Sequence, residues 1–450
     1  MNLPEKPPLT KGVEELFSDV KGKEFFDVLQ DTESYQKLNE IDKEYPYWER
    51  FKYKVKGIKH APELLWKAVK LSRLKGLSFI QVSRVPGFKF SYTTTQSILK
   101  LLHHFDMNLG GVLEGRSIIP NEDKTRYLIS SIMEEAIASS QLEGAATTRQ
   151  IAKEMLRSNR KPQNHSEKMI LNNYLTIKKV IERKEEKLCK ELILDLHRTI
   201  SGGTLKNPET EGEFRTTNNV NVVDDVTGDV FYQPPNAEYV EKLMGDFCVF
   251  ANAVDKDLEF IHPIIRGIIL HFLIGYIHPF VDGNGRTARA IFYWYLIKKG
   301  YWLVEYMSIS KVIIRAPAQY ARAYLYTEFD ENDLTYFIDY NLKCMDIALK
   351  NLQSYIKRKV MEKKNLIHLI QYENINERQA EILRSLTVNN QQRFTIAEVE
   401  GRFGVVYQTA RTDLYGLANL GYLKERKFGK KLIFFKGEEF DKKLERIMKT

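Results

Sequence analysis

Apolar residues recur at roughly helical spacing over residues 124–138, 264–277 and 286–298. Residues 220–232 differ, because apolar and polar positions alternate there and turn-forming residues lie between the two apolar groups. Such a pattern is typical of a β-hairpin. The fold class that we predict is therefore mainly α, with a β-hairpin placed between helices.

An aromatic run, Tyr45–Lys56 (YPYWERFKYKVK), lies near the start of the chain. The pattern is mixed and fits either a strand or a patch of side chains packed in a core. Aromatic residues interleaved with Lys and Arg can also stack on nucleic acid. More often, such aromatic residues lie in a core, and the aliphatic parts of the Lys and Arg side chains pack over it. We assign no site to residues 1–105.

A short polar stretch, His278–Arg289 (HPFVDGNGRTAR), separates the two apolar helices. Pro279 cannot continue a helix, so His278 is expected at a helix end that faces a loop. The imidazole of His278 is the one group in the stretch that accepts a proton near neutral pH. The stretch therefore places a candidate base at a fixed position between two helices.

The glycines of this stretch predict an anion site. Gly283 and Gly285 on either side of Asn284 allow consecutive backbone N–H groups to face an anion at the start of the second helix. Arg286 and Arg289 are three residues apart, hence on one helix face, where two guanidinium groups can hold neighbouring phosphates.

Asp282 completes the stretch with one carboxylate, the ligand that a magnesium ion already held by phosphates needs from a protein. A Gly-Asn-Gly segment alone is usually a turn, and two arginines three apart are usually solvated. Here a base, a carboxylate, two glycines and two arginines fall within one stretch. Together they suggest the transfer of a phosphorus-containing group.

At these residues the chain resembles the Fic family, whose signature HPFx(D/E)GNGRxxR is matched at every fixed position. The usual reaction of that family moves AMP from ATP to a protein hydroxyl, and phosphocholine or UMP transfer is rarer. The resemblance implies that His278 is the base and that Asp282 binds Mg²⁺ (or Mn²⁺) on the nucleotide. It also implies that the loop Gly283–Gly285 cradles the phosphates, and that Arg286 and Arg289 bind the outer ones.

A second family motif, (S/T)xxxE(G/N), is matched by Ser139, Glu143 and Gly144. Taken alone, Glu143 is as well explained as a surface residue near a helix C-terminus. The resemblance implies that Glu143 pairs with Arg289, which then cannot hold the γ-phosphate, so that the enzyme inhibits itself. In some family members the same glutamate supports removal of AMP, so the direction of the main reaction stays open.

The hairpin and a tyrosine also have counterparts in the family. There the hairpin, called the flap, aligns the target peptide by adding a strand, which here involves Val220 and Val222. A solvent-exposed structural hairpin is the alternative. A Tyr-Tyr pair of the family lies near the adenine, and the corresponding place here reads Tyr320-Ala321. We therefore assign Tyr320 to nucleotide binding.

Residues 375–437 form a separate pattern of three helices, with Thr395 as a cap, followed by a hairpin around Gly429. The hairpin Lys424–Lys436 carries six basic residues and one Glu. This pattern resembles a winged helix-turn-helix, in which four residues of the third helix would reach DNA bases: Gln408, Thr409, Arg411 and Thr412. Winged helices also dock proteins or dimerise, so DNA contact and a homodimer are both open.

Composition changes this picture little. The net charge of +9 permits a nucleic-acid partner without requiring one. The three cysteines are widely spaced, which indicates buried thiols in a reducing compartment.

The spacing of His262, His271 and His278 does not fit a helix-borne zinc site. With no signal peptide or bilayer-spanning run, we expect a cytoplasmic protein without a membrane partner. His197 lies on an apolar helix face and is expected to be packed inside.

The predicted domains are an N-terminal segment (1–105), a Fic-type domain with its inhibitory helix (106–350), a helical linker (351–374), a winged helix-turn-helix (375–437) and a charged helix (438–450). The function predicted is that of a self-inhibited protein adenylyltransferase with ATP and Mg²⁺, acting on a target protein and on itself. The main alternative is a DNA-binding regulator whose Fic domain senses nucleotide. A toxin paired with an antitoxin is a third reading. The residues do not distinguish ATP from UTP or CDP-choline.

Overall fold

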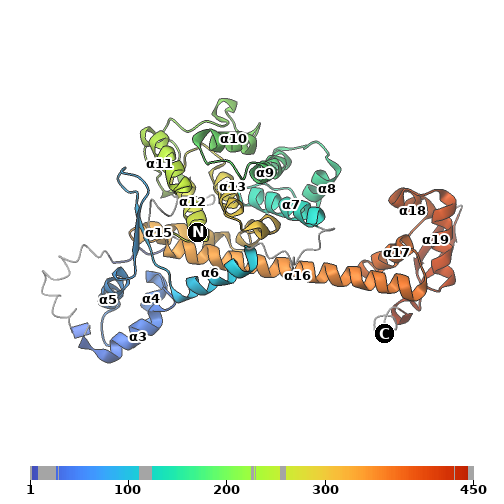
Figure 1. Ribbon diagram of the computed structural model, residues 1–450, viewed down its shortest axis with the longest axis horizontal. Coiled ribbons are helices and arrows are strands. Elements are labelled where there is room, and N and C mark those ends of the chain that lie inside the picture. Colours follow the sequence, from blue (N-terminus) through green and yellow to red (C-terminus); the bar gives the residue numbers. More distant parts are fainter. Residues whose placement is uncertain are drawn as a thin grey trace. The chain divides into compact units, whose positions relative to one another are not determined.

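The computed structural model describes residues 3–8, 27, 28, 30–110, 124–223, 228, 230–253, 260–429 and 431–443 (Figure 1). The chain forms two compact units, Met1–Leu352 and Gln353–Thr450. Their boundary falls within one long helix, α16 (Thr335–Glu373). No helix among the described residues has both the length and the apolar character needed to span a bilayer.

The first unit is mainly helical, as predicted. Its α-helices are α3 (Thr32–Asp42), α4 (Trp48–Lys54), α5 (Pro62–Leu74), α6 (Gln96–Leu109), α7 (Lys124–Leu142), α8 (Arg149–Ser158), α9 (His165–Glu182), α10 (Lys190–Ser201), α11 (Val240–Asn252), α12 (Pro263–Ile277), α13 (Asn284–Lys298), α14 (Ser310–Ile313) and α15 (Pro317–Phe329). Short 3-10 helices cover Pro208–Thr210, Ala237–Tyr239 and Trp302–Tyr306. Two antiparallel hairpins complete the unit: β1 (Ser78–Gln81) with β2 (Lys89–Tyr92), and β3 (Val222–Val223) with β4 (Val230–Tyr232).

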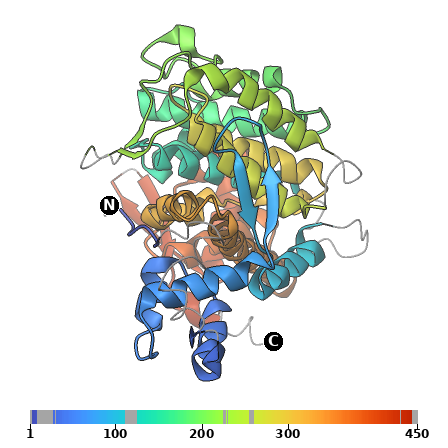
Figure 2. The ribbon, with the colours of Figure 1, turned by 90° about the vertical axis from the view of Figure 1, so that its left-hand side faces the viewer.

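Helices α12 and α13 pack against each other at the centre of this unit, with other helices around them (Figures 1 and 2). Both are buried on nearly every side, which explains why α12 is apolar around its whole circumference rather than along one stripe. Pro263 starts α12, and the His262 ring accepts a hydrogen bond from the Ile264 N–H at 3.2 Å. The polar stretch therefore lies between two buried helices, α12 and α13.

The aromatic run near the N-terminus is a helix and not a strand. It forms α4, whose Trp48 and Phe51 are buried against Trp66 of α5. Side chains three residues apart lie on one helix face, so the run builds a packed patch, which was the other expectation. Tyr336 of α16 belongs to the same cluster.

The predicted boundary after residue 105 differs from the structure, because helix α6 runs across it. Residues before that point also pack onto the rest of the first unit. The β1–β2 hairpin runs beside α12 (Figure 2). Phe88 and Phe90 contact Tyr276 of α12 edge to face. Packing of this kind joins the N-terminal segment to the central helices, so it does not form a compact unit of its own.

The second unit contains the predicted elements α17 (Glu377–Val388), α18 (Ile396–Phe403), α19 (Tyr407–Asn419), β5 (Leu423–Phe428) and β6 (Lys431–Lys436). Thr395 caps α18, as predicted, and Gly404 ends it in a left-handed conformation. Phe394 pairs with Phe434 beside the hairpin, and the helices enclose a separate apolar core. Residues 444–450 of the predicted C-terminal helix lie outside the described residues.

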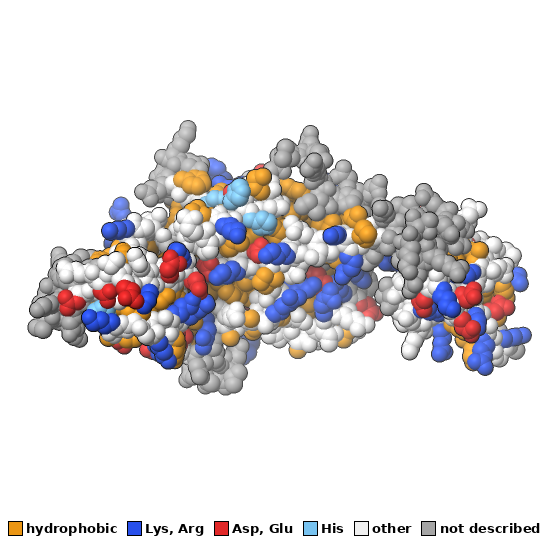
Figure 3. All heavy atoms as spheres, turned by 90° about the horizontal axis from the view of Figure 1, so that it is seen from below, with side chains coloured by type: hydrophobic (Ala, Val, Ile, Leu, Met, Phe, Trp, Pro, Cys, Tyr) orange, Lys and Arg blue, Asp and Glu red, His pale blue; other side chains and the backbone are white. Residues whose placement is uncertain are grey.

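The surface in Figure 3 carries basic side chains next to acidic ones. The net charge of +9 is therefore not gathered into one large basic face on this side of the molecule. Charge alone does not identify a nucleic-acid partner here.

Candidate active site

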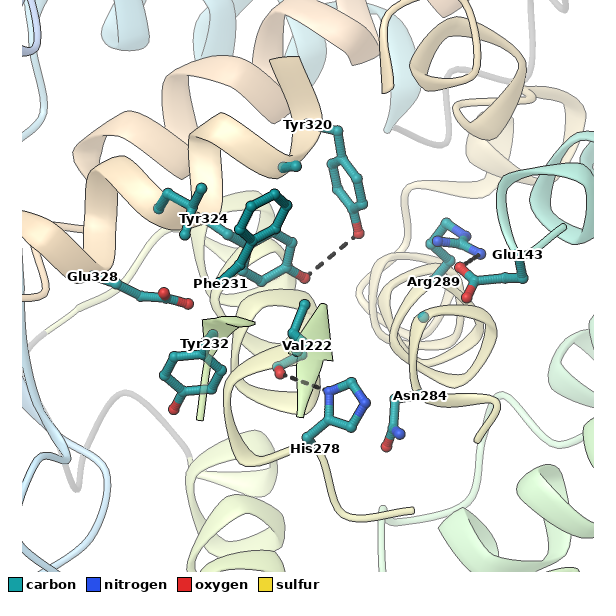
Figure 4. Close-up of a pocket in the computed structure, with 14 residues that line it drawn as sticks. Glu143, Val222, Phe231, Tyr232, His278, Asn284, Arg289, Tyr320, Tyr324 and Glu328 are labelled. Carbon is teal, nitrogen blue, oxygen red and sulfur yellow. Dashed lines mark hydrogen bonds and ion pairs between the residues drawn. The ribbon is translucent and has the colours of Figure 1, made fainter. Parts of the chain in front are cut away.

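The end of α12 places His278 at the mouth of a pocket (Figure 4). His278 caps the helix in a left-handed conformation, with φ of 50°. Its N–H donates to Ile274 O at 2.9 Å, and Pro279 then directs the chain away from the helix. The side chain is thereby held at a helix end, as the sequence predicts.

The two nitrogens of the His278 ring differ: Nδ1 has a hydrogen-bond partner, and no partner of Nε2 is found among the described residues. Nδ1 lies 3.2 Å from the carbonyl oxygen of Gly275, which can only accept a hydrogen bond, so Nδ1 carries the proton (Figure 4). Nε2 is then the unprotonated nitrogen. Burial also lowers the pKa of His278 from its ordinary value, which keeps the ring neutral at pH 7. The residue is in the state that a general base requires.

Asn284 closes the loop after His278. Its side chain accepts from the Phe280 N–H at 2.9 Å and donates to the Phe280 carbonyl at 2.8 Å. These two bonds fix the loop, and Asn284 also lines the pocket. The left-handed Gly283, with φ of 84°, precedes it as the N-cap of α13.

Two residues brace this loop from outside. His197 of α10 is buried, as predicted, but it does more than fill the core. Its Nδ1 accepts from the Gly212 N–H at 3.0 Å, its Nε2 lies 2.8 Å from Asp282 O, and its ring stacks on Phe280 at 3.7 Å. Burial lowers the pKa of His197 to about 4, so the ring stays neutral with Nε2–H as donor.

Arg215 is the second brace, and sequence reasoning did not identify it. Its Nε donates to His278 O at 2.8 Å, and its other nitrogens donate to Thr217 O at 3.0 Å and to Pro235 O. The backbone of Arg215 also donates to Pro279 O at 2.8 Å. The side chain is buried and joins the loop after His278 to both ends of the segment that carries the hairpin. A single arginine in a turn-rich segment gives no periodic signal that would show this.

Glu143 and Arg289 form the ion pair that the family resemblance implies (Figure 4). Arg289 Nη2 donates to Glu143 Oε1 at 2.8 Å, and its Nε donates to Ser139 Oγ at 2.8 Å. Helix α7 ends at Leu142, and Gly144, which follows Glu143, has φ of 89°. Ser139 and Glu143 of the second motif therefore both contact one arginine.

The Glu143 carboxylate also fills space above the start of α13. A Cβ atom added at Gly285 would lie 2.2 Å from Glu143 Oε1, so only glycine allows this approach. A carboxylate at a helix N-terminus occupies the position that favours an anion. The chain's own carboxylate therefore lies beside the predicted anion site.

The two arginines of α13 contact different neighbours. Arg286 is buried and donates to Ile200 O at 3.2 Å, whereas Arg289 reaches α7. Among the described residues, Nε and Nη2 of Arg286 and Nη1 of Arg289 have no hydrogen-bond partner. Buried donors without partners cost free energy. This is consistent with a site in which a bound anion accepts the missing hydrogen bonds.

Asp282 lies at the exposed edge of the loop, with 58% of its side chain accessible. Its Oδ1 lies 3.9 Å from Arg286 Nη2. The described residues contain no group of three His, Cys, Asp or Glu side chains that could hold a metal by themselves. One accessible carboxylate near an anion site fits a divalent ion that arrives on a phosphorylated substrate and needs one protein ligand.

The pocket continues from these groups toward the hairpin and α15. Its lining comprises Glu143, Val222, Phe231, Tyr232, Gly275, His278, Asn284, Gly285, Arg289, Tyr320, Ala321, Tyr324, Leu325 and Glu328. The expected hairpin is present as β3 and β4, and Val222 pairs with Tyr232. Val220 lies before β3 and does not line the pocket. Part of the predicted turn, residues 224–227 and 229, lies outside the described residues.

Tyr320, which was assigned to nucleotide binding, lines the pocket, and His271 contacts its hydroxyl. The Nε2 atom of His271 lies 2.8 Å from the Tyr320 hydroxyl. Burial lowers the pKa of His271 to about 3, so this histidine is neutral and packed inside, as expected. His262, the third histidine considered for zinc, lies 3.0 Å from Asp106 instead.

Part of the chain is similar to known proteins. Residues 187–296, about a quarter of the chain, match the model of the Fic/DOC family. A protein adenylyltransferase Fic of Nematostella vectensis is 30% identical over 183 residues, which cover 40% of this chain and 38% of that protein. A protein adenylyltransferase Fic of Drosophila grimshawi is 35% identical over 109 residues, covering 24% of this chain and 20% of that protein.

A solved structure shows the same fold. The crystal structure of a Fic family protein from Desulfovibrio desulfuricans superimposes with a TM-score of 0.50 at 18% identity, covering 77% of this chain and 98% of that one. The chain spans less than two-fifths of the length of the curated relatives described above. The matched stretch 187–296 includes the loop and its two braces but not Glu143.

Proposed function

Since the chain carries a Fic/DOC domain, we propose that it transfers AMP from ATP to a hydroxyl group of a protein. The observation that carries this proposal is the neutral His278 with a free Nε2, held beside the start of α13 and its partnerless arginine nitrogens. A base next to an anion site is the arrangement that phosphoryl or nucleotidyl transfer needs.

The proposed step uses these groups as follows. The oxygen of the target hydroxyl attacks the α-phosphorus of ATP and its proton passes to Nε2 of His278. The bond from the α-phosphorus to the bridging oxygen breaks, and pyrophosphate leaves with that electron pair. The N-terminus of α13 and Arg286 and Arg289 hold the phosphates, and Asp282 ligates the Mg²⁺ that accompanies them.

We further propose that Glu143 inhibits this reaction within the same chain. Its carboxylate pairs with Arg289 and lies over Gly285, so it takes both a charge partner and the space that the terminal phosphate of ATP would need. ATP then binds weakly or with its α-phosphorus poorly aligned to the attacking oxygen.

The hairpin next to the pocket offers a way to present a target. Strand β3 lies at the pocket through Val222, and a two-stranded sheet leaves backbone groups on its outer edges. A target segment that adds a strand there would bring its hydroxyl toward His278 without a fixed side-chain sequence.

The test uses wild type, Glu143→Gly, His278→Ala and the double variant, each incubated with α-labelled ATP and Mg²⁺ and separated on a denaturing gel. Label on the Glu143→Gly chain or on an added lysate protein, weak label on wild type, and none on either His278→Ala protein would support the proposal. Folded proteins that carry no label in any form would overturn AMP transfer, and UTP and CDP-choline would then be tested in the same way.

A second function is favoured by the second unit. Gln408, Arg411 and Thr412 are exposed on one side of α19, while Thr409 is half-buried. On β5 every residue after Leu423 is exposed, including Lys424, Arg426 and Lys427. An exposed polar helix beside a basic hairpin is what a winged helix presents to DNA.

We propose DNA binding by residues 375–437 as this second function, alone or beside AMP transfer. A gel-shift assay with genomic fragments at rising salt tests it. Retention of particular fragments that weakens with salt supports DNA contact. Retention that is equal for all fragments, or none at low salt, contradicts a sequence-reading role.

A further inference from the structure

A buried carboxyl group, Glu328 of α15, lines the pocket at the end away from the Glu143–Arg289 pair (Figure 4). Its Oε2 is buried and has no hydrogen-bond partner among the described residues. The described residues also give it no ion pair. A buried carboxyl group without a hydrogen-bond partner costs free energy unless a ligand supplies that partner. Packing alone therefore does not account for Glu328.

The groups that face Glu328 come from three elements: Tyr232 of β4, Tyr276 of α12 and Tyr324 of α15. All three hydroxyls donate elsewhere. Tyr232 donates to Tyr276 O at 2.9 Å, Tyr276 to Gly87 O at 3.2 Å and Tyr324 to His271 O at 3.4 Å. The surroundings of the carboxyl are thus aromatic and supply no cation.

We propose that Glu328 recognises the base of the nucleotide, by hydrogen bonds from its carboxyl group to the edge of adenine. This inference rests on the proposed function and names the residue that chooses the nucleotide. Aromatic side chains around a single polar group are suited to a flat heterocycle, because the ring stacks while its edge is read by hydrogen bonds.

The chemistry of the carboxyl group favours adenine. Burial raises the pKa of Glu328 to about 8, so at neutral pH it is mostly protonated and offers one donor and one acceptor. Adenine presents a donor, the N6 amino group, beside an acceptor nitrogen on both of its edges, so either edge can pair with the protonated carboxyl. Guanine presents a donor–acceptor pair of this kind at O6 and N1–H only, because its other edge, with O6 and N7, has acceptors only. Once ionised, the carboxylate would face the acceptor nitrogen of adenine with a lone pair.

The affinity for ATP is expected to depend on pH. Adenine binds the protonated form, so bound ATP raises the pKa of Glu328 further, and binding takes up a proton when the free group is ionised. ATP affinity is therefore expected to be full below pH 8 and to fall as the pH rises above it.

The experiment measures MgATP binding by titration calorimetry in the full chain carrying Glu143→Gly and His278→Ala. These changes remove turnover and two other titrating groups from the pocket. At pH 9, two buffers of different ionisation enthalpy report the protons taken up. We expect uptake approaching one proton per ATP in this parent, and none after Glu328→Gln, which keeps a donor and an acceptor without titrating.

Glu328→Met completes the test, with Glu238→Gln on the exposed surface as matched control. We expect Glu328→Gln to keep the preference for ATP over GTP, and Glu328→Met to lose about tenfold in ATP affinity and most of that preference. A parent that binds ATP without proton uptake, and at unchanged affinity after Glu328→Met, overturns the role of Glu328 alone. A folded parent that binds no ATP overturns the proposed function as well, and melting curves of each variant identify any that fail to fold.

Discussion

The Glu143 carboxylate lies 2.8 Å from the Arg289 guanidinium and directly over Gly285. One side chain from the end of α7 thus neutralises an arginine of α13 and covers the first turn of the same helix. Under the proposed function, an incoming phosphate has to displace it from both contacts, so ATP binding is expected to depend on the position of this glutamate.

Replacing Glu143 by Gln should tighten MgATP binding. The ion pair that ATP must break is a charge-assisted hydrogen bond, worth about 1.5–3 kcal/mol when buried, so the gain should be about ten- to a hundredfold. Calorimetric titration measures it. Glu134→Gln is the matched control, because Glu134 lies on the same helix but pairs with Arg149. Equal affinity of both variants and wild type would contradict inhibition by Glu143.

The pH profile of transfer should report the base. The pKa of His278 is lowered by burial, and the Glu143 charge works against that lowering. In Glu143→Gly the pKa should therefore drop further, so the rate stays constant through neutral pH and declines only well below pH 6.5. Initial rates between pH 5 and pH 8 test this. An acid limb centred at or above pH 7 would argue against His278 as the proton acceptor.

Removing the base should cost about 10²–10⁴ in rate, the usual contribution of general-base catalysis. Because Nδ1 of His278 is held by Gly275 O, His278→Gln can keep that bond yet cannot take a proton. Both His278→Ala and His278→Gln should bind MgATP like their Glu143→Gly parent. A His278→Gln protein with parental turnover would show that the hydroxyl is deprotonated by another group.

The His197 brace should matter for both stability and rate. His197→Phe keeps a ring against Phe280 but loses the bonds to Gly212 N and Asp282 O. Each unmade bond at a buried group costs about 1–3 kcal/mol, so the free energy of unfolding should fall. The rate at saturating MgATP should fall as well, because the loop before Gly283 loses its support. Chemical denaturation and initial rates measure the two effects. An unchanged rate would show that His197 contributes to packing only.

The second unit gives a prediction about salt. If α19 and the hairpin contact DNA phosphates, Lys424→Ala and Arg426→Ala should each lower the slope of log affinity against log salt by about 1. Arg411→Ala, on the helix, should instead reduce discrimination between fragments. Lys350→Ala, an exposed lysine of the first unit, serves as control. Unchanged slopes in both hairpin variants would show that the hairpin does not contact DNA.

Much of this protein follows from local sequence signals. The periodicity of 264–277 and 286–298, with Pro279 and two glycines between them, predicts two helices and a loop that the structure contains. Thr395, Gly404 and Gly429 mark element ends in the second unit for the same reason. Caps, turns and periodicity act between residues close in the chain, so a single sequence reveals them.

Other features depend on contacts between distant residues and only the tertiary structure decided them. Arg215 reaches His278 across 63 positions, and the pocket joins Glu143, Val222 and Glu328 from separate elements. The aromatic run Tyr45–Lys56 left strand and packed patch open, and its burial against α5 and α16 settled it as a helix. The sequence by itself determined which residues form the candidate base and anion loop. The fold decided which distant side chains brace that loop, cover it and line the far end of its pocket, because packing and charge act through space and leave no regular spacing in the chain.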